Sequence, residues 1–366
     1  MSTFEVWLCR DDGTRLALLD TAAGFEYSIA LHDVGACSLV LPGSFDRSLL
    51  APDRKLEFWR QPPNGALALE RVYLIRRLVS ATDAEGRATI KLIGLDGNHL
   101  LKRRIVAYAA GAAQASMTDQ ADDMARAVVI DNLGADATAA RQISSTYLTI
   151  AAERSAGPSL TLSFSRDNVL EVLKDVAAAA QTAGTAVYWH VVDATPAQWQ
   201  FRTYTGQPGA DHSYPDGVNP VLLSLELGNL AEPELDEDYT QEVTYAYAGG
   251  QGEGADRVVA TAEDTARSGR SLFGRCEGWG DSRNEDSTGG VTAQAQRLLD
   301  EGRPKLRFAA KIVDSAGNRY GIHWRWGDRV TAIYSGYTFE AIVRAIRVSV
   351  DGNGKEAIDA RLEVEE

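Results

Sequence analysis

The chain has 366 residues, of which 45% are hydrophobic and 24% charged, and its formal net charge is −14. This is an ordinary globular composition, and the length predicts two to four domains. The acidic balance argues against a protein that grips nucleic-acid phosphates, because that task needs a basic surface. No apolar run approaches the roughly 20 residues of a membrane span. The opening residues, MSTFEVWLCRDDG, lack a secretory signal, so we expect synthesis and folding in a cytoplasm.

Residues that could carry catalysis or bind metal are scattered. The three cysteines, Cys9, Cys37 and Cys276, form no CxxC pair, and we expect free, buried thiols. The five histidines, at 32, 99, 190, 212 and 323, occur singly, and His190 and His323 lie in aromatic runs typical of structural histidines. The glycine-rich run 249–254 lacks the Lys-Ser/Thr of a phosphate-binding loop. We therefore predict no catalytic, cofactor-binding or metal-binding residue.

The first 108 residues are predicted to form a β domain. Apolar residues alternate from Phe4 to Val40, with turn signals every eight to twelve residues, which is typical of an all-β fold. A helical turn is expected over Asn98 to Arg104. Two proline residues, Pro62 and Pro63, lengthen one loop of this domain.

Residues 109–218 predict an α+β insert, which begins with a run of small residues, AAGAAQAS. Apolar residues at helical spacing indicate one helix that ends at Gly134, with Ser116 or Thr118 as its N-cap. A second helix is capped by Ser165 or Asp167 and ends at Gly184. Two strand-like runs, TAVYWHVV and AQWQFRTY, follow it.

The remaining chain predicts a mixed region, 219–305, part of which completes a second β-barrel, and then that barrel's main part, 306–366. The acidic residues from Glu232 to Asp238 predict a solvated turn. A strand is expected over Glu242 to Tyr247, and a helix over VTAQAQRLLDEG, ending at Gly302. The run GIHWRWGD predicts a strand that buries Trp324 and Trp326 on one face.

Two hairpins at opposite ends of the chain share one plan. The stretch Val72 to Ile105 and the stretch Ile342 to Leu362 each place an arginine, then Asp-x-x-Gly, then an isoleucine at matching positions. These are Arg76 and Arg344, Asp83 to Gly86 and Asp351 to Gly354, and Ile90 and Ile358; Asp53-Arg54 and Asp328-Arg329 precede a short strand in each copy. Either the chain contains a duplicated β module, or both stretches follow the ordinary sequence rules of hairpins.

The run YLIRRLVSATDAEGRATIKLIGLDGNHLLKRRIV resembles the N-terminal part of tail hub proteins of long-tailed bacteriophages. The matching elements are Gly94-Leu95-Asp96, Leu100-Leu101 and Arg103-Arg104-Ile105. The C-terminal part, with Trp326 to Val330 before the hairpin, resembles the closing barrel of that family.

The resemblance implies a mainly β fold with α+β inserts: two related β-barrel domains, an α/β insert and a smaller peripheral domain. It implies a homotrimeric baseplate hub in the virion tail tip, where six barrels form a ring that joins the sixfold tube to a threefold fibre or spike. Implied partners are the distal tail protein or tail tube, the tape-measure protein and a fibre or spike. Three copies at −14 each carry −42, so a negative lumen would let genomic DNA pass without binding. No membrane insertion is expected.

The family's hubs often continue into a peptidase, lysozyme-like or fibre-bearing region, and the end at Glu366 argues against cell-wall cleavage by this chain. Two alternatives remain open. One is an enzyme or lectin that acts on cell-surface glycans, with tryptophan-lined surfaces and a carboxylate pair that includes Glu234. The other is the spike-type hub of a contractile injection system.

Overall fold

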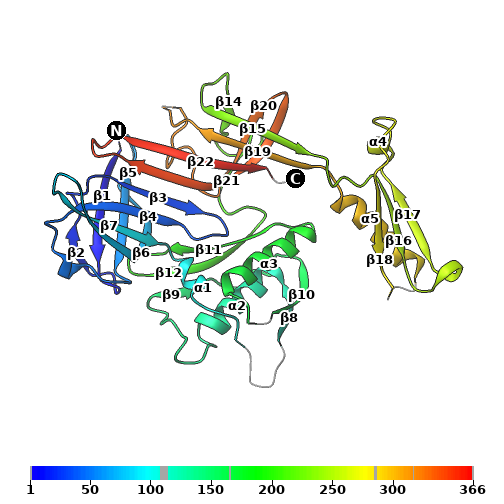
Figure 1. Ribbon diagram of the computed structural model, residues 1–366, viewed down its shortest axis with the longest axis horizontal. Helices are drawn as coiled ribbons and strands as arrows, with labels where there is room; N and C mark the ends of the chain where they lie inside the picture. The colour runs from blue at the N-terminus through cyan, green and yellow to red at the C-terminus, as the bar shows by residue number, and fades with distance from the viewer. Residues whose placement is uncertain (1, 108–113, 165, 284–286, 316, 365–366) are drawn as a thin grey trace. The chain divides into compact units, whose positions relative to one another are not determined.

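The structure is a computed structural model, and it describes residues 2–107, 114–164, 166–283, 287–315 and 317–364 (Figure 1). The chain divides into two compact units, Met1–Pro233 with Ala310–Glu365, and Glu234–Ala309. The mainly β fold class with α+β inserts is confirmed. The predicted domain boundary at residue 108 and the predicted cap Ser165 lie outside the described residues, and the boundaries at 218 and 305 stay predictions.

The first β module contains seven strands, in the order β2-β1-β5-β6-β7-β4-β3. Alternating burial along β3, β4 and β7 places one side of each strand in the core and the other on the surface, as the period-two pattern predicts. The strands are β1 (Thr3–Cys9), β2 (Arg15–Leu18), β3 (Phe25–Ala30), β4 (Ala36–Pro42), β5 (Lys55–Gln61), β6 (Ala68–Thr82) and β7 (Ala88–Leu95).

Aromatic packing closes this module although its end strands are not hydrogen-bonded to each other. The Phe25 ring of β3 lies 5.3 Å from Phe4 of β1 and 5.5 Å from Phe58 of β5. Tyr27, two residues further along β3, lies 5.2 Å from the same Phe58 ring. The sheet therefore curls until β3 packs over β1 and β5, and side-chain burial holds it there.

The second β module repeats this arrangement. Its strands follow the order β15-β19-β22-β21-β20, and β13 and β14 add to β20 in parallel. The strands are β13 (Asp211–His212), β14 (Leu222–Ser224), β15 (Leu230–Asp238), β19 (Lys305–Ile312), β20 (Arg329–Tyr334), β21 (Tyr337–Val350) and β22 (Glu356–Val364). The order β15-β19-β22-β21-β20 matches β3-β4-β7-β6-β5 strand for strand.

The two hairpins have the same register, with a constant offset of 268 residues. Thr82 pairs with Ala88 as Val350 pairs with Glu356, and the ladders shift register at Arg76 and at Arg344. These correspondences favour the duplicated module over unrelated hairpins, because bulge and register agree along the whole ladder.

The hairpin turns are also equivalent. Asp83 accepts hydrogen bonds from the backbone N–H of residues 85 and 87, and Asp351 accepts them from those of residues 353 and 355. Gly86 and Gly354 have φ of 81° and 77°, a left-handed conformation that favours glycine. The Asp-x-x-Gly pattern thus specifies one turn twice.

The predicted alignment of the Asp-Arg pairs is wrong by one residue. The Asp53 N–H donates to the Ile75 carbonyl at 3.0 Å, and its counterpart is Gly327, whose N–H donates to Val343 at 2.9 Å. Asp53 and Gly327 also share a positive φ, 62° and 83°. The equivalent positions of the two modules are therefore defined by hydrogen bonding and not by residue identity, and Arg54 is equivalent to Asp328.

The run GIHWRWGD is not a strand, which corrects that prediction. Residues 321–323 form a turn, and the Arg319 N–H donates to His323 Nδ1 at 2.8 Å. Trp324 is fully buried, whereas Trp326 is only half-buried. A strand would require an extended backbone here, but the chain turns back to reach β20.

The insert between the two modules packs helices on a three-stranded sheet, β11-β12-β9. Met124, Val128, Leu173 and Val176 share one core with Val72 of β6, so the insert is fixed to the first module. The elements are α1 (His99–Lys102), β8 (Ala115–Gln120), α2 (Ala121–Leu133), β9 (Leu148–Ile150), β10 (Ser159–Phe164), α3 (Val169–Thr182), β11 (Val187–Asp193) and β12 (Trp199–Thr205).

Both predicted helices exist, but their caps differ from the prediction. Ser116 and Thr118 lie in β8, which pairs with β10, and α2 begins after Gln120. The N-cap of α3 is Asn168, whose side chain accepts from the Leu170 N–H, and Asp167 is not the cap. Gly184 follows α3 with φ 88°, as its predicted end requires.

The second unit contains the end of β15, the start of β19 and the segment that connects these two strands. In the first module the equivalent strands, β3 and β4, are joined by residues 31–35 alone. The unit packs one helix, α5, on the sheet β17-β16-β18 through Ala246, Ala248 and Val291. Its elements are β16 (Tyr245–Gly249), β17 (Val259–Glu263), α4 (Thr265–Ser268), β18 (Glu277–Asp281) and α5 (Thr288–Glu301).

Three predictions for this part of the chain change. The acidic run from Glu232 to Asp238 belongs to strand β15 and is not a turn, because it pairs with β19. The strand predicted from Glu242 begins at Tyr245. The predicted helix ends at Gly302 as expected but starts earlier, because Ser287 caps it by accepting from the Gly290 N–H.

Replacement of either turn glycine by alanine tests the repeat. We expect Gly86→Ala and Gly354→Ala each to lower the free energy of unfolding by about 1 kcal/mol, because alanine is strained in the left-handed region. No heavy atom lies within 4 Å of a Cβ built at either position, so strain alone acts.

The control is Gly289→Ala in the first turn of α5, where a Cβ also meets open space and the backbone is helical. There alanine should be neutral or stabilising. Thermal unfolding of the three variants, followed by circular dichroism, checks this. Unequal losses at Gly86 and Gly354 would contradict the equivalence of the two turns.

Candidate functional site

Strand β21 has different partners along its two halves, and this joins the modules. Its first half, Tyr337 to Ile342, pairs with β20. After the bulge at Arg344, the second half, Ala345 to Val350, pairs with β3 of the first module. A partly buried ion pair between Arg60 of β5 and Glu356 of β22, at 2.6 Å, fixes the same junction.

Strand β6, the counterpart of β21, has a partner on only one side of its second half. Residues 68–74 pair with β5, and residues 77–82 pair with β7. Among the residues that the structure describes, no strand lies on the other edge of residues 77–82. Another open edge is that of β15, which ends the strand order on one side as β2 does on the other. Backbone N–H and C=O groups at such edges are free to pair with another chain.

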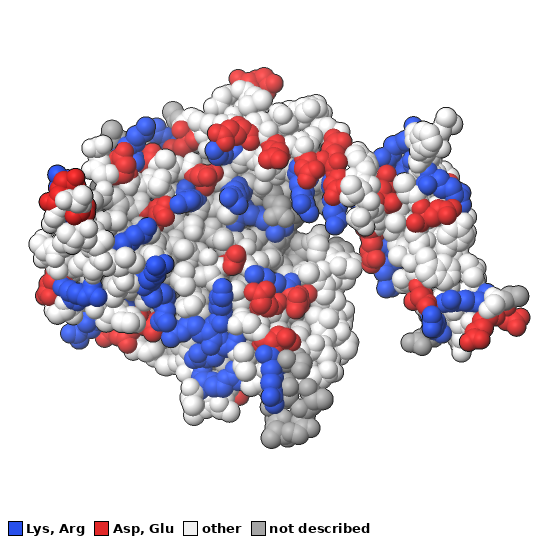
Figure 2. Space-filling view, in the orientation of Figure 1, with Lys and Arg blue, Asp and Glu red and all other residues white. Residues whose placement is uncertain are grey.

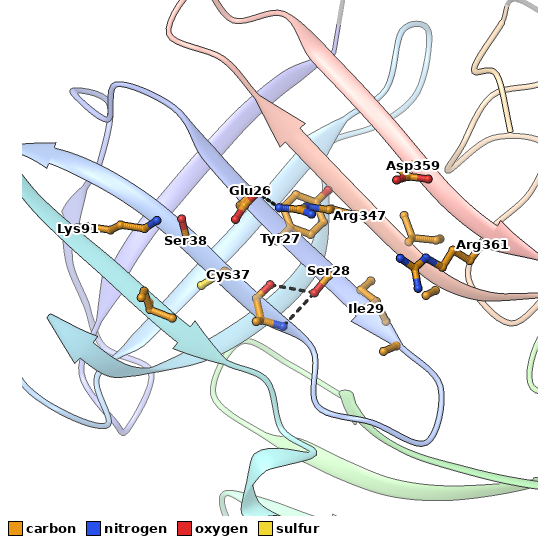
Figure 3. A pocket seen from close by; sticks show the side chains of 15 residues that line it. Glu26, Tyr27, Ser28, Ile29, Cys37, Ser38, Lys91, Arg347, Asp359 and Arg361 are labelled. Atoms are coloured by element: carbon orange, nitrogen blue, oxygen red, sulfur yellow. Dashed lines mark hydrogen bonds and ion pairs between the residues drawn. The ribbon is translucent and has the colours of Figure 1, made fainter. Parts of the chain in front are cut away.

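The sheet between these edges presents a polar, concave face. A hollow of 440 Å³ lies over β3, β4, β7, β21 and β22. Figure 3 shows Glu26 beside Arg347, with Lys91, Asp359 and Arg361 on neighbouring strands. The hydrogen bond to Glu26 raises the pKa of Arg347. Charges of both signs alternate across the face, and none is arranged as a catalytic acid–base pair.

A buried polar cluster ties the first module to the insert. Arg71 of β6 donates to Asp96 at 2.8 Å, to Asp193 at 3.3 Å and to the Val191 carbonyl at 3.0 Å. It also contacts the Nε2 atom of His190. One guanidinium therefore satisfies groups from β11 and from the chain after β7, and both acids are buried with it.

The histidines in this region are neutral and structural. Burial, with Arg71 nearby, lowers the pKa of His190 well below its usual value. Burial lowers the pKa of His32 to about 3, and the His32 ring stacks on Tyr188 and Trp189 at 5.4 and 5.2 Å. The structural role predicted for His190 agrees with these contacts, and neither histidine is available as a general base at neutral pH.

Residues considered for a glycan site are not brought together. Glu234 is exposed on β15, whereas Trp7 and Trp59 are half-buried in the first module beneath Arg15, at 4.4 and 5.3 Å from its guanidinium carbon. Cys9 and Cys37 are buried free thiols, but Cys276 is only half-buried, which corrects that prediction.

Sequence reasoning missed Arg71, the centre of the polar cluster. The available signal was a charged residue in an apolar strand, but the acids that pair with Arg71 come from distant segments of the sequence.

Among the described residues, no group of three or more His, Cys, Asp or Glu could hold a metal ion. Within the same residues, no helix has the length and apolarity needed to cross a bilayer.

Residues 64–362 match the family described as Siphovirus ReqiPepy6 Gp37-like protein. This match covers β6 and β7 of the first module, the second module up to residue 362 and everything between them. A comparison with curated proteins finds no match.

Solved structures with a similar fold include two tail proteins. The 43 kDa tail protein of prophage MuSo2 from Shewanella oneidensis has a TM-score of 0.60 and 12% identity, over 99% of this chain and 98% of its own. The tail protein of Neisseria meningitidis MC58 has a TM-score of 0.54 and 12% identity, over 98% and 96%. A chain of the Francisella PdpA-VgrG complex has a TM-score of 0.52 and 8% identity, over 100% and 58%. At these identities the likeness concerns the fold.

Removal of the Arg71 side chain should be strongly destabilising. We expect Arg71→Ala to cost about 3–5 kcal/mol of unfolding free energy, because two buried carboxylates lose their counter-ion. Urea unfolding, with Arg202→Ala on the exposed surface of β12 as the control, measures this cost. A loss below about 1 kcal/mol would contradict the role of Arg71 as the link between module and insert.

Proposed function

Because this chain belongs to the Siphovirus ReqiPepy6 Gp37-like protein family, we propose that it is a structural hub protein at the tip of a phage tail. In this proposal three copies form the hub, which joins the sixfold tail tube to a threefold fibre or spike and surrounds the DNA exit channel. The hub carries no catalytic site, and the virion tail tip is its location. The tail tube or distal tail protein, the tape-measure protein and the fibre or spike are its partners.

The repeated β module is the observation that carries this proposal. Each chain contains two modules with matching strand order and hairpin register. Three chains supply six modules, so a threefold assembly can present a pseudo-sixfold surface to a sixfold tube. A single-module chain could not make this change of symmetry with three copies.

The concave face described above is the wall of the proposed channel. Its charged residues are Glu26, Lys91, Arg347, Asp359 and Arg361. Basic and acidic groups are interleaved there, so DNA phosphates meet no continuous basic stripe and can pass without tight binding. These five side chains carry a net charge of +1, so in this proposal the wall is not the negative lumen that the overall charge of −14 led us to expect.

The mass of the purified protein in solution tests the proposal. Light scattering at several concentrations should give a particle near three times the 39.6 kDa of one chain, because the hub needs six modules. A monomer at every concentration would contradict the homotrimer.

A further inference from the structure

The internal repeat shows that one strand edge of the first module lacks the neighbour that its equivalent has in the second module. Residues 345–350 of β21 are covered by β3, and the constant offset makes residues 77–82 of β6 their equivalents. Nothing in the described part of the same chain covers that edge. The six residues, RLVSAT, carry one charge, so nothing in them blocks pairing with a further strand.

Strand β15 is the equivalent of β3 in the second module. The Val313 N–H donates to the Asn229 carbonyl at 2.9 Å, as the Val40 N–H donates to Gly24 at 3.3 Å. Leu230, which follows Asn229, therefore corresponds to Phe25. Whereas β3 has strands on both sides, β15 pairs with β19 alone among the residues that the structure describes, and it ends the sheet.

We propose that residues 77–82 of β6 pair antiparallel with β15 of a second copy of this chain. The inference rests on the proposed hub function and names the contact that would build it. Each copy offers one β6 edge and one β15 edge, so the contact is head-to-tail, and three copies can close it into a ring.

The charges on the two edges are complementary. Glu232, Glu234 and Asp236 are exposed at alternate positions of β15. Arg77 is exposed on the β6 edge, and Arg76 and Arg103 next to it share one acid, Asp53. Figure 2 shows Lys and Arg side chains gathered on the part of the surface that contains β6 and α1. Two acidic β15 edges would repel each other, which disfavours a symmetric β15–β15 contact.

The intrachain contact supplies the register. Phe25 is opposite Val350 and Glu26 opposite Ser349, which places Leu230 opposite Thr82 and Ala231 opposite Ala81. The backbone of Glu232 has φ 49°, and the proposed pairing places a one-residue bulge at this position. Beyond it, Glu234 comes opposite Val79 and Asp236 opposite Arg77. In this pairing, the acidic residues of β15, for which the sequence predicts a solvated turn, face the basic end of β6 in a second copy.

A charge exchange tests the pairing. We expect Arg77→Glu and Asp236→Arg each to weaken trimer formation at least tenfold in light-scattering titrations, because each places like charges together. The double variant should form trimers with an affinity within threefold of that of the natural chain. Arg202→Glu, on the exposed surface of β12, is the matched control and should change nothing.

A cross-link tests the register without altering charge. In a Cys276→Ser background, Ala81→Cys combined with Ala231→Cys should give covalent dimers and trimers on oxidation, reversed by reductant. Ser80→Cys with Ala231→Cys shifts the pair by one residue, to opposite faces of the sheet, and should cross-link much less.

The outcomes separate this inference from the proposed function. Suppose that the natural chain is a trimer, that both charge variants form trimers equally well, and that the Ala81→Cys/Ala231→Cys variant does not cross-link. This result overturns the pairing and leaves the hub proposal intact. A natural chain that is monomeric at every concentration overturns the homotrimer, and the pairing with it.

Discussion

The antiparallel ladder between β3 and β21 is the contact on which the rest of this structure depends. A strand has two edges, and each edge buried in a sheet must find hydrogen-bond partners. The bulge at Arg344 divides β21, so that one half serves its own module and the other half receives β3. This shared strand converts two separate β modules into one continuous sheet, and the Arg60–Glu356 ion pair holds the junction.

The same constraint explains why the chain tolerates long insertions. The α/β insert lies between the two modules, and the second unit lies between β15 and β19, where the first module has only a short loop. Both positions leave the ladders of the modules uninterrupted. The insert is held by side chains, chiefly through the buried Arg71 cluster and the core that includes Val72. Insertions at strand connections cost little, provided that the paired backbone is preserved.

The sequence predicts the local features well and the distant ones poorly. The Asp-x-x-Gly turns at Gly86 and Gly354 are specified by four residues, so the hairpins and their likeness could be predicted. The cap of α2 could not, because Ser116 lies in a strand whose partner, β10, is some 40 residues away. Pairing with β19 likewise overrides the turn-like composition of the acidic run. Open edges are visible only once the strand order is known, because they are defined by a missing neighbour.

The most direct measurement of the central claim is backbone hydrogen exchange, followed by mass spectrometry on separated monomer and trimer fractions. The account predicts that the amides of residues 77–82 exchange quickly in the monomer and become protected in the trimer. In the trimer, their protection should match that of residues 345–350, which β3 covers within each chain. Equally fast exchange of residues 77–82 in both fractions would contradict the account, because the β6 edge would then remain open in the assembled protein.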